Sequence, residues 1–375
     1  MEIYLIGLAV ALVGGLLMSR LTRLLHLPAV TAYLVAGLLL GPFFLGRLNV
    51  PGLGFNTLEE VNVLSIVSQT ALGFIAFAMG NEFRLSQLRT IGSRAIIIGI
   101  LQAVITTIVV DVILLLLHLF FPHIISVPCA ITLGAIAAAT APAATLMVVR
   151  QYKADGPMTR LLMLVVALDD AVGLLLFSVS FGIATALSNG QVSVLAVVVE
   201  PIVEILLSVG LGGFMGLLLH WVERFFHSRS KRMSLSVAFV MLTVGLSMLE
   251  FQIGPVHCGF SLLLVCMMTG TIFCNVCPTS EELMDGWTMP LNILFFVISG
   301  AELDLNVLSQ PVTLIVGIIY IIARSAGKYC GANLSCRITK EPKSIVDHLG
   351  ITLLPQAGVA LGMAITAASL SDGAL

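Results

Sequence analysis

The segment from Leu161 to Leu187 is predominantly apolar, and its only charged residues are two adjacent aspartates, Asp169 and Asp170. A helix of this length crosses a bilayer, which requires about 20 predominantly apolar residues. Each carboxylate at that depth costs roughly 2.5–3.5 kcal/mol on insertion scales. Repulsion between the two adds to this cost, so we expect one aspartate to hold a proton or to meet a cation. The pair is therefore a candidate ion or proton site rather than a polar pair that only packs helices together.

The composition extends this interpretation to the entire chain. Hydrophobic residues make up 58% of the 375 residues and charged residues only 10%, which leaves too little polar surface for a soluble domain. The net charge of −2 argues against a nucleic-acid partner. The N-terminal segment lacks the basic flank of a signal peptide, so we expect it to remain as a first span. The sequence predicts an all-α integral membrane protein with a single transmembrane domain, residues 1–375.

Apolar runs separated by charged and turn residues predict twelve membrane-spanning segments. Their expected bounds are 3–19, 28–45, 61–80, 95–121, 126–149, 158–187, 192–222, 233–252, 256–275, 287–301, 311–335 and 345–370. Fifteen of the eighteen Lys and Arg residues fall on the side of the odd-numbered loops. By the positive-inside rule these loops are cytoplasmic and the N-terminus is outside. From the size of the chain we expect a prokaryotic inner membrane.

An internal repeat relates the two halves of the chain. The third segment ends in GNEFRL, residues 80–85, and the tenth ends in GAELDL, residues 300–305, on the opposite side of the membrane. Segments three to five then correspond to segments ten to twelve, which indicates an inverted-topology repeat of the kind found in secondary transporters. The sixth segment has no counterpart before Leu375, so we expect a thirteenth helix that this sequence omits; the alternative is a protein of twelve spans.

Two corresponding segments carry a proline in mid-membrane. Pro142 lies in ATAPAAT and Pro355 in LLPQAGVA, and each is expected to break its helix. Irregular backbone at that depth is tolerated only where protein covers it or where it lines a cavity. Two broken helices of opposite direction would therefore cross near the midplane and present their half-helix dipoles to an ion.

Few buried charges are available to balance the aspartates. Lys328 is the first candidate for a counter-charge, and Arg324, one turn away on the same face, is the alternative. Lys328 could instead extend to the cytoplasmic interface. Cys274 and Cys277 form an isolated CNVC, and a zinc site is not expected without a second pair of ligands. The seven cysteines suit free thiols, and we expect neither a cofactor nor an enzyme's active site.

These residues resemble the monovalent cation/proton antiporter superfamily, and within it the electrogenic sodium/proton branch with an aspartate pair. The resemblance rests on Asp169 and Asp170 in the sixth segment, Lys328 in the eleventh, and the breaks at Pro142 and Pro355. It extends from the first segment to Leu375, and the absent final helix departs from the family pattern.

The resemblance implies a membrane domain in two parts. A core of about residues 95–187 and 311–375 would move against a scaffold of about 1–94 and 192–301, which also forms a homodimer interface. Na⁺ or Li⁺ would bind mainly to Asp170, helped by Asp169 and by backbone carbonyls near Thr140, and would exchange for protons by alternating access. The transported ions and membrane lipid would be its partners.

Two alternatives to this function remain open. A sodium-coupled symporter of an organic solute could use the same inverted fold, although its cavity would need more polar groups than these apolar segments offer. A potassium/proton exchanger would share the architecture and differ in cation selectivity.

Overall fold

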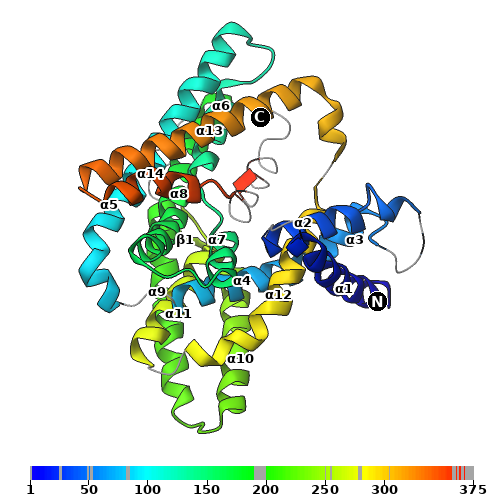
Figure 1. Cartoon of the computed structure of the whole chain (residues 1–375), viewed down its shortest axis with the longest axis vertical. Helices are drawn as coiled ribbons and strands as arrows, with labels where there is room; N and C mark the ends of the chain where they lie inside the picture. Colours follow the sequence, from blue (N-terminus) through cyan, green and yellow to red (C-terminus); the bar gives the residue numbers. More distant parts are fainter. Residues whose placement is uncertain are drawn as a thin grey trace.

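The computed structural model is almost entirely helical (Figure 1). It describes the backbone of residues 2–24, 28–48, 50, 54–81, 85–189, 200–249, 251–253, 256–277, 281–303, 305–356, 360, 363–364 and 367. The α-helices in these ranges are α1 (Glu2–Leu24), α2 (Ala29–Leu40), α3 (Leu58–Val63), α4 (Ser65–Asn81), α5 (Leu85–Phe120), α6 (Val127–Ala138), α7 (Pro142–Gln151), α8 (Pro157–Asn189), α9 (Glu200–Glu223), α10 (Arg229–Ser247), α11 (Leu262–Val276), α12 (Glu281–Ala301), α13 (Pro311–Ile338) and α14 (Lys343–Thr352). Short 3-10 helices, η1 (Leu45–Leu48) and η3 (Leu305–Ser309), and a small hairpin complete them.

The described helices follow the predicted segments closely, but fewer of them are full spans than predicted. Among the described residues, five helical stretches are long and apolar enough to cross a bilayer: Tyr4–Thr22, Ala29–Leu48, Gly92–Phe120, Ile202–Glu223 and Pro311–Ile338. Others are apolar but shorter, partly because a break divides one predicted segment into two helices, as with α6 and α7. The predicted total of twelve spans is therefore not reached on helix length alone.

The start of the ninth predicted segment was wrong. Residues 256–258 form strand β2 (Val256–Cys258), which pairs antiparallel with β1 (Phe251–Ile253), and α11 begins only at Leu262. Gly254 and Pro255 stand between the strands in the sequence, and both residue types disfavour a continuous helix. The side chain of Ser261 accepts a hydrogen bond from the Leu264 N–H and caps α11 at its N-terminus.

Helices far apart in the sequence pack in pairs, α5 with α13, α4 with α11 and α2 with α12 (Figure 1). Glycines allow the backbones of α2 and α12 to come into direct contact. A Cβ atom on Gly37 would lie 1.9 Å from the Val297 carbonyl oxygen, and one on Gly300 would lie 2.2 Å from that of Leu34. Any larger side chain at either position would push the two helices apart.

Glycines also form the contact between α4 and α11. A Cβ atom on Gly80 would lie 2.0 Å from the Met267 carbonyl oxygen, and one on Gly270 would lie 2.2 Å from that of Phe77. Gly80 and Gly300, the first residues of the two similar motifs, thus each allow close backbone contact in a different helix pair.

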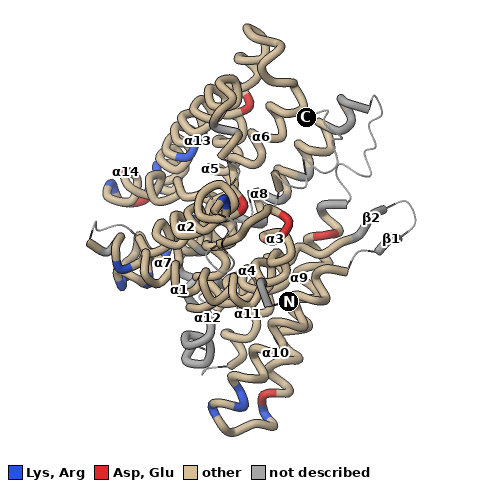
Figure 2. The backbone as a smooth tube through the Cα atoms, turned by 90° about the vertical axis from the view of Figure 1, so that its right-hand side faces the viewer, with Lys and Arg blue, Asp and Glu red and all other residues tan. Residues whose placement is uncertain are grey.

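The charged residues are sparse along the helices. Figure 2 shows long uncharged stretches, with Lys and Arg gathered at α14, around α7 and where α9 meets α10. Lys328 is an exception, because it belongs to α13 and none of its side chain is exposed. Helices α5, α6, α8, α13 and α14 pack around it and position the site described next.

Candidate functional site

Two interrupted helices meet at the centre of the site. Helix α6 ends at Ala138, residues 139–141 are extended, and Pro142 begins α7 at a position where proline's missing N–H is not needed. The second break follows α14, where residues 354–356 have no regular structure. The Ala141 N–H donates a hydrogen bond to the Pro355 carbonyl at 2.9 Å. The two predicted breaks therefore lie in direct contact, with each proline beside the other segment.

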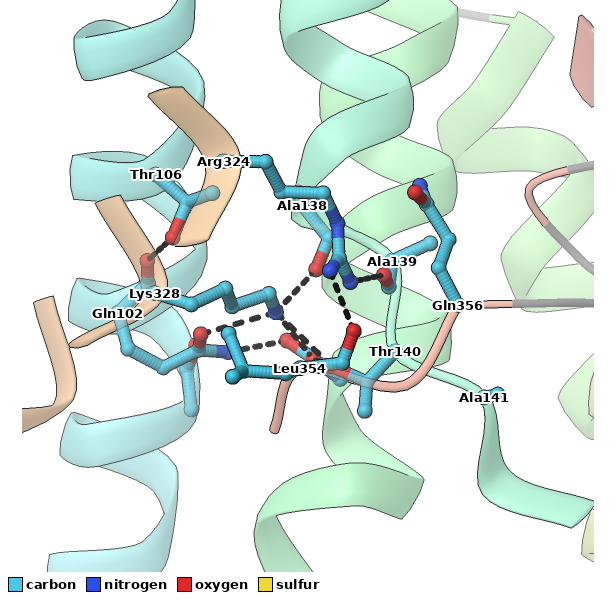
Figure 3. A network of polar contacts seen from close by, with 12 residues as sticks. Gln102, Thr106, Ala138, Ala139, Thr140, Ala141, Arg324, Lys328, Leu354 and Gln356 are labelled. Carbon is cyan, nitrogen blue, oxygen red and sulfur yellow. Dashed lines mark hydrogen bonds and ion pairs between the residues drawn. The ribbon is translucent and has the colours of Figure 1, made fainter. Parts of the chain in front are cut away.

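A buried ion pair lies at this crossing. The ammonium group of Lys328 is 2.8 Å from Asp169 Oδ2, and both side chains are fully buried. The Thr140 hydroxyl donates to the same carboxylate oxygen and accepts from Lys328 Nζ at 2.9 Å (Figure 3). Lys328 also donates to the carbonyl oxygen of Ala138 at the end of α6. Of the two candidate counter-charges, Lys328 is the one that forms an ion pair with Asp169 among the described side chains.

Gln102 of α5 is a site residue that the sequence analysis missed. Its amide nitrogen donates to Asp169 Oδ1, and its amide oxygen accepts from Lys328 Nζ at 3.0 Å. It is fully buried, and Thr106 donates to its backbone carbonyl at 2.6 Å. The available signal was a single glutamine in an apolar predicted span, which matches no motif. Gln102 contacts both charges at once and fixes their relative position.

Arg324 lies one turn from Lys328 and contacts the backbone of both breaks. Its guanidinium donates to the Leu354 carbonyl at 2.5 Å and to the Ala139 carbonyl at 2.9 Å (Figure 3). Carbonyls at an interrupted helix end have no intrahelical partner and carry partial negative charge. Arg324 neutralises this charge at the ends of α6 and α14 and so holds the two broken segments together.

Gln356 forms a second connection across the crossing. Its amide nitrogen donates to the Ile136 carbonyl of α6 at 2.9 Å and to the Tyr320 hydroxyl of α13 at 3.0 Å. The segment after Pro355 is thereby bound to both neighbouring helices.

Asp170 belongs to α8, but its side chain lies outside what the structure describes. The described oxygen atoms near the crossing include those of Asp169, Thr140 and the Gln102 amide together with backbone carbonyls, and oxygen ligands suit a hard monovalent cation. Any cation that reaches Asp169 must compete with the ammonium of Lys328 for the same carboxylate.

The sequence matches a known protein family over nearly the whole chain. Residues 8–375 match the family described as sodium/hydrogen exchanger, transmembrane. The chain belongs to this family. The predicted family is thus confirmed, as is the prediction that the chain is a transporter of sodium and hydrogen ions and not an enzyme.

Similar proteins include antiporters from two kingdoms. The chain is 23% identical over 361 residues to the Na(+)/H(+) antiporter NhaS4 of Synechocystis. This alignment covers 93% of this chain and 83% of that protein. It is 31% identical over 94 residues to K(+) efflux antiporter 5 of Arabidopsis thaliana, covering 25% of this chain and 14% of that protein.

Solved structures share the fold over almost the whole chain. The sodium proton antiporter MjNhaP1 of Methanocaldococcus jannaschii at pH 8 aligns with a TM-score of 0.67 at 20% identity, covering 98% of this chain and 86% of that one. A structure of the same antiporter from electron microscopy aligns with a TM-score of 0.76 at 18% identity, covering 98% and 85%. The all-helical antiporter fold is therefore confirmed.

Proposed function

We propose that this exchanger binds Na⁺ or Li⁺ mainly at Asp170, with Asp169 and Thr140 nearby, and exchanges it for protons with net movement of charge. The observation that carries the proposal is the fully buried pair of Asp169 and Lys328 at the crossing of two broken helices. Breaking a buried ion pair by removing one partner costs about 3–5 kcal/mol. The empty site, with two aspartates and one lysine, keeps an unbalanced negative charge that is costly to move, whereas a site that has bound a cation or protons can change sides.

The charges of the site explain why protons and cations compete. Two adjacent aspartates carry more negative charge than Lys328 neutralises, so the remainder attracts either a cation or a proton. Binding of one ion excludes the other, which is the requirement for exchange. Two protons moved against one sodium ion would carry net charge and make the exchange electrogenic.

The helix contacts support an inverted repeat. The glycine contacts between α4 and α11 match those between α12 and α2. Adding 220 to a residue number in α4 gives its counterpart in α12, and adding 233 to a residue number in α2 gives its counterpart in α11. The corresponding pairs are Gly80 with Gly300, Phe77 with Val297, Gly37 with Gly270, and Leu34 with Met267. A chance match of one short motif would not reproduce four backbone contacts.

The packing also supports a core and a scaffold. Helices α5, α6, α8, α13 and α14 pack against one another, and α1, α2, α4 and α12 share a separate cluster of buried apolar residues. We infer that residues of about 95–187 and 311–375 move against about 1–94 and 192–301, and that two copies join through the scaffold. The N-terminus would lie outside, in a prokaryotic inner membrane, because the basic loops favour the cytoplasm.

Proton flux from proteoliposomes tests the cation site. Vesicles with an acidic interior receive Na⁺, Li⁺, K⁺ or a neutral solute, and the loss of the proton gradient is recorded. We expect Na⁺ and Li⁺ to dissipate the gradient and Asp170→Asn to reduce the response to that of empty vesicles. The matched control is Asp155→Asn, because Asp155 is exposed and pairs only with Arg160 among the described contacts. Sodium-coupled flux retained by Asp170→Asn would refute the role of Asp170.

Potassium/proton exchange is the second candidate. It is supported by the 31% identity to K(+) efflux antiporter 5, which extends over 94 residues of this chain. A response to K⁺ larger than that to Na⁺ in the same vesicles would select it, and a response only to a solute would select the symporter.

A further inference from the structure

A second cluster of buried polar groups lies away from the ion site, where α9, α10 and α11 meet. Glu223 ends α9 and Cys277 follows the end of α11, and they are only 3% and 4% exposed. The Cys277 thiol donates to Glu223 Oε2 at 3.2 Å. Arg232 of α10 contacts the other carboxylate oxygen, Oε1, at 2.5 Å. The carboxylate thus directs one oxygen to an arginine and the other to a thiol.

His220 completes the cluster from the preceding turn of α9. Residues three apart lie on one face of a helix, so His220 and Glu223 point to the same side. One of its ring nitrogens, Nε2, is 2.9 Å from Arg224, whereas the buried Nδ1 has no hydrogen-bond partner in the described part of the chain. One ligand atom from each of His220, Glu223 and Cys277 lies within 4.8 Å of the other two.

We propose that His220, Glu223 and Cys277 form a binding site for Zn²⁺ or a metal ion of similar ligand preference. Imidazole nitrogen, thiolate sulfur and carboxylate oxygen are the zinc ligands of proteins, and water can fill a fourth position. Metal–ligand bonds of about 2.0–2.3 Å place tetrahedral ligand atoms roughly 3.3–3.7 Å apart. The sulfur and Glu223 Oε2 are already at 3.2 Å, so only the imidazole has to approach.

The proton and charge balance of binding follows from the contacts. The Cys277 S–H bond breaks, its proton passes to water, and the sulfur binds the metal as thiolate. Glu223 turns Oε2 from the thiol to the metal, while Arg232 keeps its contact with Oε1. Arg232 also donates to the Cys277 sulfur at 3.4 Å, and its positive charge favours the thiolate. Because binding releases a proton, the affinity for the metal increases with pH.

Cys274, the first cysteine of the CNVC motif, is not a ligand of the proposed metal site. Cys274 lies three residues before Cys277 and directs its sulfur toward the carbonyl oxygens of Thr271, at 3.3 Å, and Gly80, at 3.7 Å. The motif alone did not predict a site, because the other two ligands, His220 and Glu223, come from α9, more than fifty residues earlier in the sequence.

Titration of the purified full-length chain with Cd²⁺ tests the site, because a cadmium–thiolate bond has its own ultraviolet charge-transfer band. After treatment with a chelator, we expect one Cd²⁺ per chain with this band, displaced by Zn²⁺. Cys277→Ser should remove the band, and His220→Ala should weaken binding by at least about 100-fold, since even groups outside the ligand set change metal affinity about 10–100-fold. Cys274→Ser and His227→Ala are the matched controls and should bind as the unchanged chain does.

Three results would overturn the proposal: no thiolate band in the folded, unchanged chain, an equal loss of the band in Cys274→Ser, or unaltered affinity in His220→Ala. The melting temperature of each variant without metal identifies a folding defect. Should Cys277→Ser not fold, the ratio of the affinities of His220→Ala and His227→Ala still decides the outcome.

Discussion

Gln102 connects the two opposite charges of the ion site. Its amide nitrogen donates to Asp169 and its amide oxygen accepts from Lys328. Each charged group therefore has a hydrogen bond to Gln102 in addition to the ion pair. Hydrogen bonds to charged groups contribute about 1.5–3 kcal/mol each, more than those between neutral groups. Gln102 is therefore expected to affect both the stability of the protein and the position of the aspartate.

Replacing Gln102 with leucine tests this role. We expect Gln102→Leu to lower the stability by about 2–3 kcal/mol and to change the Na⁺ concentration that gives half-maximal exchange. The control is Thr107→Val on the same helix, because the buried Thr107 hydroxyl has no partner in the described part of the chain and its loss should cost little. Thermal melting in detergent and vesicle flux measure the two effects; equal melting temperatures for both variants would contradict the prediction.

At the scale of helices, two glycines at the start of two similar sequence motifs form similar contacts. Gly80 and Gly300 each bring a helix into contact with the backbone of its partner, and a Cβ atom at either position would lie 2.0–2.2 Å from a carbonyl oxygen. No real Cβ atom occupies such a position, so an alanine must separate the helices.

Gly80→Ala and Gly300→Ala should therefore destabilise the protein to a similar extent. The expected loss is about 1–3 kcal/mol, the usual effect of overpacking. Gly317→Ala is the matched control, because a Cβ atom on Gly317 in α13 meets nothing within 4 Å. Melting temperatures compare the three variants. A destabilisation by Gly317→Ala equal to that of the other two would show that helix contacts are not the cause.

At the scale of the whole molecule, the number of charges in the site decides whether exchange responds to membrane voltage. Moving one elementary charge through 100 mV corresponds to about 2.3 kcal/mol. A cycle that exchanges two protons for one sodium ion moves one net charge across the membrane, whereas a cycle of one proton for one sodium ion moves none. We expect the site without the charge of Lys328 to follow the second cycle.

Lys328→Gln should retain exchange and lose its response to voltage, and its stability should decrease by about 3–5 kcal/mol because Asp169 loses its partner. Exchange rates in vesicles clamped at 0 and −100 mV measure this. Arg337→Gln is the control, since Arg337 is an exposed residue in the last turn of the same helix. A voltage response preserved in Lys328→Gln would remove Lys328 from the charge that is transported.

The helices and breaks were predictable from the sequence, while the contacts of the site were not. Hydrophobic runs locate helices because a backbone in lipid must form its own hydrogen bonds. Pro142 and Pro355 marked the breaks because proline removes a backbone donor and disrupts a helix interior, although Pro290 lies inside α12 without ending it. The choice between Lys328 and Arg324 depended on which turn of α13 lies beside Asp169 and which lies beside the carbonyls of Ala139 and Leu354.

Tertiary packing also decided the contacts that have no sequence pattern. Gln102 joins the ion site, and His220 and Glu223 approach Cys277, only because α5 packs on α13 and α9 packs on α11. Local order along the chain follows from short-range physics, namely hydropathy, proline and glycine. A binding site brings together residues far apart in the sequence, and their distances are set by the packing of helices against each other.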